Sequence, residues 1–187
     1  MKVSKDELFA KIPAVDEAAV DAALAAERAG FDRKIVVLDD DPTGVQTVNG
    51  IHVYTDWSPE SIAEGFAEEN AMFFILTNSR AFQAAETEAE HWKIAERVAA
   101  EAKRTGKQFM LISRSDSTLR GHYPLETETL AHALEEAGER IDGEVLMPFF
   151  KEGGRFTIDD VHYVQEGTDL TPAGETEFAR DKTFGYT

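Results

Sequence analysis

Three short apolar runs, each followed at once by polar residues, constrain the fold of this chain more than any other feature. The runs are KIVVL at 34–38, MFFIL at 72–76 and QFMLI at 108–112. They are rich in β-branched and aromatic residues, too short for helices, and separated by helical segments. Continuous apolar strands that alternate with helices are typical of a parallel sheet. We therefore predict an α/β fold: a Rossmann-like, doubly wound, mainly parallel sheet flanked by helices.

Capping signals and apolar spacing define the remaining elements. Ser58 and Pro59 are predicted to form the N-cap and first position of one helix, and Gly30 and Gly138 are predicted to end two others. Helices are predicted over 16–29, 61–69, 84–104 and 125–137, with a last one starting at Thr171–Pro172 and capped with help from Glu175. Further strands are predicted over 48–55, 143–147 and 161–164.

Length and charge limit the classes of protein to consider. The 187 residues suit a single α/β domain over 1–187, with a helical N-terminal extension over 1–30 whose alanine-rich face packs on the body or on another subunit. The net charge of −17 repels nucleic acid and anionic lipid. The sequence has no cysteine and no apolar run of about 20 residues, and we do not expect its charged N-terminus to be a secretory leader. We therefore expect a cytoplasmic protein.

The polar residues after the three runs form the candidate site. Ligands of an open parallel sheet bind at the carboxyl ends of its strands, so these residues are expected to meet at one edge. The clusters are Asp39-Asp40-Asp41-Pro42-Thr43-Gly44, Thr77-Asn78-Ser79-Arg80 and Arg114-Ser115-Asp116-Ser117-Thr118-Leu119-Arg120-Gly121.

Each cluster has a structural interpretation beside the functional one. An aspartate of the first cluster could simply cap a turn, although three adjacent carboxylates repel one another and favour a site. Arg80 alone would ordinarily be solvated. Arg114 and Arg120 are suited to bind a planar anion in a bidentate manner, but a salt bridge with Asp116 that shapes the loop is the alternative. The histidines lack the spacing of zinc ligands, and we predict no metal site.

Several strings occur together in a characteristic order: DDPTG at 40–44, TNSR at 77–80, DSTLRG at 116–121, and GR at 154–155 before HYV at 162–164. In this the chain resembles the four-carbon acid sugar kinase family, also called the YgbK-like proteins, over about residues 34–179. The resemblance is to the N-terminal, sugar-binding domain of that family. The DSTLRG string is specific, and its combination with DDPTG is a strong signal.

The resemblance implies an ATP-dependent kinase that phosphorylates a terminal hydroxyl of a sugar acid such as threonate or erythronate. ATP and Mg²⁺ would be bound mainly by a C-terminal nucleotide-binding domain, which we expect to be absent from this chain, so that the chain alone is inactive. The implied substrate-binding residues are Asp40, Asp41, Arg80, Arg114, Ser115, Asp116, Ser117 and Arg120. Asp41 is the preferred general base and Asp116 the alternative. The oligomeric state stays open.

Two other functions compete with this one. The LDDDPT string at 38–43 also fits the motif of a haloacid-dehalogenase-type phosphatase, with Asp39 as nucleophile and Asp159-Asp160 as the distal acidic pair. That interpretation leaves residues 114–121 unexplained. A non-catalytic sugar-acid-binding module is the third interpretation.

Overall fold

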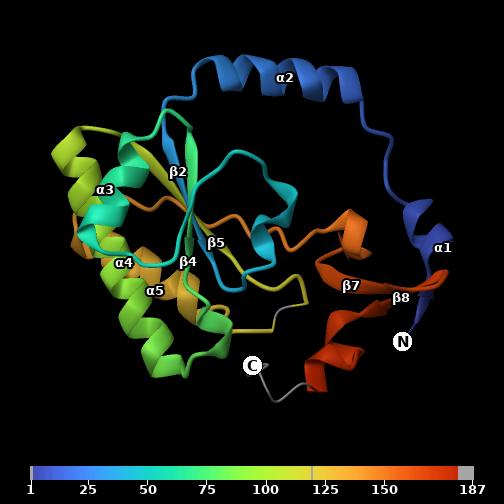
Figure 1. The fold of residues 1–187 in the computed structure, drawn as a ribbon. Coiled ribbons are helices and arrows are strands. Elements are labelled where there is room, and N and C mark those ends of the chain that lie inside the picture. Colours follow the sequence, from blue (N-terminus) through green and yellow to red (C-terminus); the bar gives the residue numbers. More distant parts are fainter. Residues whose placement is uncertain (1, 119, 181–187) are drawn as a thin grey trace.

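A computed structural model describes residues 2–118 and 120–180, and its centre is a four-stranded parallel sheet (Figure 1). The strand order is β3-β4-β2-β5, with β2 and β4 in the interior. The bounds are β2 (Lys34–Asp39), β3 (Val53–Tyr54), β4 (Met72–Leu76) and β5 (Phe109–Arg114). The predicted α/β fold with a parallel sheet and flanking helices is confirmed. The strand predicted over 48–55 is much shorter, because only two of its residues pair with β4.

Three helices pack on one face of this sheet and form the main core. They are α3 (Pro59–Ala67), α4 (Ala84–Thr105) and α5 (Leu125–Glu136). Alternate residues of the two interior strands, Val36 and Leu38 of β2 and Phe73 and Ile75 of β4, point into this core. On the opposite face, Met110 and Ile112 of β5 are exposed.

The helix ends follow the predicted signals. Ser58 accepts a hydrogen bond from the backbone of Ser61, with Pro59 at the first position of α3. Gly106 ends α4 with a φ of 70°, a conformation that glycine adopts without strain. The N-terminal helix α2 (Glu17–Ala29) begins at its cap Asp16 but buries none of its residues, so it does not pack on the body as one of our alternatives expected. No helix in the described part of the chain is long and apolar enough to span a membrane.

A second, antiparallel sheet follows the first and was not predicted (Figure 1). Its order is β1-β8-β7-β6, with β1 (Val3–Ser4), β6 (Arg155–Ile158), β7 (Val161–Glu166) and β8 (Asp169–Pro172), and the short helix α1 (Lys5–Phe9) packs beside it. The helix predicted from Thr171 is wrong. Thr171 and Pro172 belong to β8, and only 3₁₀ turns at Ala173–Glu175 and Phe178–Arg180 follow.

The strand predicted over 143–147 is also wrong. This segment follows α5 without pairing with β5 or with any other described strand, and Val145 is 89% exposed. The segment has the apolar pattern of a strand, but its backbone does not pair with the edge of β5. Another 3₁₀ turn, Lys151–Gly153, leads from here into β6.

Candidate functional site

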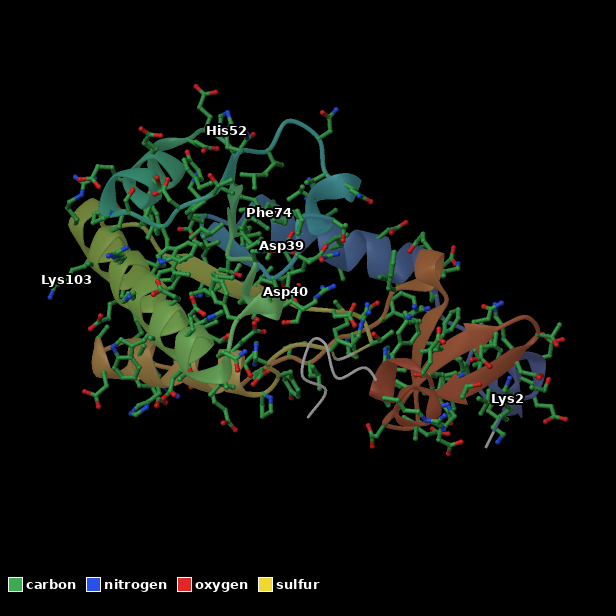
Figure 2. All side chains as sticks on the ribbon, turned by 60° about the horizontal axis from the view of Figure 1, so that its bottom comes forward. Lys2, Asp39, Asp40, His52, Phe74 and Lys103 are labelled. Carbon is green, nitrogen blue, oxygen red and sulfur yellow. The ribbon has the colours of Figure 1, made fainter. Side chains whose placement is uncertain are left out.

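The three polar clusters meet at the carboxyl edge of the parallel sheet, as predicted. Asp39 is the last residue of β2 and lies in register with Leu76 of β4 and Arg114 of β5. Its carbonyl accepts hydrogen bonds from the backbone and the hydroxyl of Thr77, at 2.9 and 3.0 Å. The central strand therefore brings the loops after β4 and β5 to the loop after β2. Figure 2 shows Asp39 and Asp40 in the interior of the molecule.

Arg80 joins all three loops through its guanidinium. Its Nε and Nη2 donate to the two carboxylate oxygens of Asp40 at 3.0 and 2.8 Å. Its Nη1 lies 3.3 Å from Oδ2 of Asp41 and 3.7 Å from Oδ1 of Asp116. Only 11% of the Arg80 side chain is exposed, so this residue serves first as the centre of an ion-pair network. Asp40, 3% exposed, lies behind it.

The loop after β5 is shaped by Asp116. Arg120 donates two hydrogen bonds to its carboxylate, at 3.0 and 3.1 Å, and the backbone and hydroxyl of Thr118 also donate to it. The structural alternative considered for this cluster, an internal salt bridge, is therefore present. Leu119 of the same string lies outside the described residues.

Gly44 allows the loop after β2 to turn back against the end of that strand. A Cβ at this position would overlap both carboxylate oxygens of Asp39 and Nη1 of Arg114. Asp39 is fully buried, and Arg114 donates to its Oδ1 at 3.2 Å. Its Oδ2 has no hydrogen-bond partner within the described residues. Gly44 thus permits a close contact that no other residue type would allow.

The pKa values of the four carboxylates differ because their surroundings differ. Burial raises the pKa of Asp40 to about 6, against the opposing effect of Arg80. Burial also raises the pKa of Asp39, with Arg114 opposing it. Burial would raise the pKa of Asp116 too, but hydrogen bonds from Arg120 and Thr118 outweigh it and lower the pKa to about 2. At Asp41 the bonds from Thr43 and the charge of Arg80 outweigh burial, so its pKa is lowered.

The antiparallel sheet covers one side of the site, which the sequence did not reveal. His162 of β7 lies with Nε2 2.5 Å from the carbonyl oxygen of Ser117, and its Nδ1 is 3.0 Å from the hydroxyl of Thr157. Arg155 of β6 is close enough to Asp116 and Arg120 for their charges to affect its pKa, which burial lowers. Arg120 and Arg155 both stack on the ring of Phe178. In the sequence, only the GR and HYV strings at 154–155 and 162–164, which contain Arg155 and His162, indicated that this region contributes to the site.

A cavity of about 2120 Å³ runs along the free edge of β5 and ends at the site. It exceeds the roughly 300–1,000 Å³ of a small-molecule pocket, so a small ligand would occupy only part of it. Its site end is lined by Thr43, Gln46, Arg80, Arg114, Ser115, Asp116, Ser117 and Arg120. Arg114, at 39% exposed, and Asp41, at 25%, are the more accessible of the charged groups described above.

The site carboxylates do not fit a metal ion. Among the described residues, no group of three His, Cys, Asp or Glu side chains is arranged to hold one. Asp39, Asp40 and Asp116 each bind an arginine, and Asp41 accepts from Thr43 and faces Arg80. Balanced positive and negative side chains instead suit a small polar ligand with its own anionic and hydroxyl groups.

A family profile described as "Sugar-binding N-terminal domain" matches residues 35–187. The match covers most of the chain, and the protein belongs to this family of sugar-binding domains. It is consistent with the N-terminal domain of the four-carbon acid sugar kinases. Searches of curated proteins and of solved structures found no significant match.

Proposed function

We propose that this domain binds a four-carbon sugar acid of the threonate or erythronate type and presents its terminal hydroxyl for phosphorylation by ATP. The observation that carries the proposal is that Arg114, which lines one end of the cavity with 39% of its side chain exposed, is close enough to the partly exposed Asp41 for its charge to lower the pKa of that carboxylate. A guanidinium suits the carboxylate of the ligand, and a carboxylate suits its hydroxyls.

Asp41 is the better candidate for the general base. It is more exposed than Asp116, which accepts bonds from Arg120 and Thr118, and more exposed than Asp40, which is held by Arg80. Because the pKa of Asp41 is lowered, its carboxylate is ionised at neutral pH. It would accept the proton of the ligand hydroxyl as the bond from oxygen to phosphorus forms. ATP and Mg²⁺ would be held by a nucleotide-binding domain.

The phosphatase alternative is disfavoured by two observations. Asp39, its required nucleophile, is fully buried between Gly44 and Arg114. Asp159 and Asp160, its distal acidic pair, form the turn between β6 and β7 of the antiparallel sheet and do not end a strand of the parallel one.

Phosphoryl transfer is tested by joining the domain to a nucleotide-binding domain and following phosphorylation of threonate and erythronate by ³¹P NMR. Asp41→Asn is expected to lower turnover by about 10²–10⁴-fold while changing the Kd for the acid little. Intact turnover in Asp41→Asn, with loss in Asp116→Asn, would assign the base to Asp116. Mg²⁺-dependent release of phosphate by this chain alone, abolished by Asp39→Asn, would establish the phosphatase instead.

A further inference from the structure

Glu126, in the first turn of α5, is a buried carboxylate directly behind the site. It is 1% exposed, and it links the loop after β4 to the loop after β5. The hydroxyl of Ser79 donates to its Oε1 at 2.8 Å, and the hydroxyl of Ser115 donates to its Oε2 at 2.5 Å. A carboxylate buried this deeply requires such donors, because an unsatisfied buried charge is strongly destabilising.

A further polar neighbour of Glu126 is His91 of α4, whose Nε2 lies 3.7 Å from Oε1, and Asp40 is close enough for the charge of Glu126 to raise the pKa of Asp40. Nδ1 of His91 is 2.8 Å from the carbonyl oxygen of Thr87, so the hydrogen of a neutral ring lies on Nδ1. Burial lowers the pKa of His91 and favours that neutral ring. Nε2 then has no hydrogen to donate, so Glu126 accepts its side-chain hydrogen bonds from the hydroxyls of Ser79 and Ser115.

This arrangement fixes the direction of the Ser115 hydroxyl. A serine hydroxyl has one hydrogen and two lone pairs, and the hydrogen of Ser115 is used by Glu126. Ser115 also lines the site end of the cavity, so it offers only lone pairs to a ligand there. Its neighbour Arg114 offers only donors. The two adjacent residues therefore present opposite hydrogen-bonding characters to the same cavity.

We infer that Glu126 is a positioning residue that makes Ser115 an obligate hydrogen-bond acceptor, and that Ser115 thereby selects a hydroxyl group of the ligand and rejects an anionic oxygen at the same point. The inference rests on the proposed function and deepens it. It gives the ligand an orientation, with its carboxylate toward the arginine and one hydroxyl donating to Ser115. A ligand that lacks that hydroxyl leaves the Ser115 lone pairs unsatisfied.

The test uses calorimetric titration of this chain with threonate and erythronate and with the three acids that each lack one hydroxyl: 2,3-, 2,4- and 3,4-dihydroxybutanoate. Wild type is expected to bind at least one of the three more weakly by about three- to tenfold, the value of one neutral hydrogen bond. Ser115→Ala is expected to abolish the preference for the trihydroxy acid over that dihydroxy acid and to leave the preferences over the other two unchanged.

Glu126→Leu removes the acceptor and frees the Ser115 hydroxyl to rotate, so its lone pairs are no longer held toward the cavity and the same preference is expected to weaken without vanishing. The double variant Ser115→Ala/Glu126→Leu should show the same preference as Ser115→Ala alone, since Glu126 acts on the preference only through the Ser115 hydroxyl. Ser79→Ala is the matched control. Ser79 also donates to Glu126 but is fully buried, so its loss should lower stability and leave the preference intact.

A preference that survives in Ser115→Ala, or that is unchanged in a Glu126→Leu protein that unfolds cooperatively, overturns the inference. Ser115→Ala, at a partly exposed position, keeps the test decisive if Glu126→Leu does not fold. A failure of the proposed function gives a different result. In that case the wild type binds neither threonate nor erythronate, which contradicts both the proposed function and the inference.

Discussion

The guanidinium of Arg80, which follows β4, lies 3.7 Å from the carboxylate of Asp116, which follows β5. The same guanidinium binds Asp40, which follows β2. One buried side chain therefore joins three loops that are distant in the sequence. This relationship makes the site a single electrostatic unit, and its stability depends on the shape of the arginine as well as on its charge.

Arg80→Lys should destabilise the fold because an ammonium cannot donate to three carboxylates in the same fixed geometry. We expect a loss of about 1.5–3 kcal/mol in the free energy of unfolding, as for the loss of a hydrogen bond between charged groups. Urea denaturation measures it. Arg104→Lys is the matched control, because Arg104 also donates two bonds to one carboxylate, that of Glu101, but from an exposed position. Equal losses in both variants would contradict the central role of Arg80.

Gly44→Ala should distort the site, because the added Cβ overlaps the carboxylate of Asp39 and the guanidinium of Arg114. We expect a loss of about 1–3 kcal/mol of stability, as for overpacking, together with weaker sugar-acid binding. Gly174→Ala, where a Cβ would meet no atom within 4 Å, should change neither property. Thermal unfolding and calorimetric titration of the two variants provide the comparison, and wild-type behaviour of Gly44→Ala would refute the proposed close packing.

Asp116 should stabilise the fold in a pH-dependent manner. Its folded-state pKa of about 2 lies below the ordinary value of 3.8, so its stabilisation is present above pH 4 and is lost as the pH falls toward 2. The stability difference between wild type and Asp116→Asn should therefore be about 2 kcal/mol at pH 6 and about half that at pH 3. A difference that stays constant between these pH values, measured by urea denaturation, would exclude this account.

Asp40 should behave in the opposite way. Its pKa is raised to about 6, so its ionisation opposes folding, and the stability that its protonated form allows is lost as the pH rises from about 4 to 6. Comparing the pH dependence of unfolding for wild type and Asp40→Asn over this range isolates the effect. Stability that rises more steeply in wild type than in Asp40→Asn across this window would show that the carboxylate is not destabilised by burial.

His162→Ala should loosen the loop after β5. Nε2 of His162, in β7 of the antiparallel sheet, contacts the carbonyl oxygen of Ser117 in that loop. We expect faster hydrogen exchange in residues 115–118 with little change in the parallel strands. His132→Ala provides the control, since His132 is an exposed residue of α5. Unchanged exchange in 115–118 would mean that the antiparallel sheet does not support the site.

The sequence was sufficient to predict the parallel strands, their helices and the edge where the polar clusters meet, because each depends on local signals. Of the antiparallel sheet the sequence predicted only part of β7, at 161–164. The pairing of β1 with β8 joins residues more than 160 positions apart, for which no local signal exists. The strand predicted over 143–147 was wrong for a related reason. An apolar pattern does not reveal whether a segment pairs with the edge strand of a sheet.

Within the site, the sequence identified the charged residues and the salt bridge of Asp116 with an arginine of its own cluster, but not the partners of Asp39, Asp40 and Asp41. Arg80 donates two hydrogen bonds to Asp40 and leaves Asp41 more accessible, and this choice depends on the geometry of the loops. Glu126 carried a usable signal, since it precedes the buried residues Leu130 and Ala133 by four and seven positions and shares their helix face.

Calorimetric titration of this chain with threonate and erythronate tests the central claim most directly. We predict saturable binding of at least one of these acids, weakened by about tenfold to a hundredfold in Arg114→Ala, as expected for the loss of a charge-assisted hydrogen bond. Arg28→Ala, an exposed arginine of α2 away from the cavity, should bind as wild type does. Absence of binding, or equal affinity in wild type and Arg114→Ala, would contradict the assignment of this edge as the sugar-acid site.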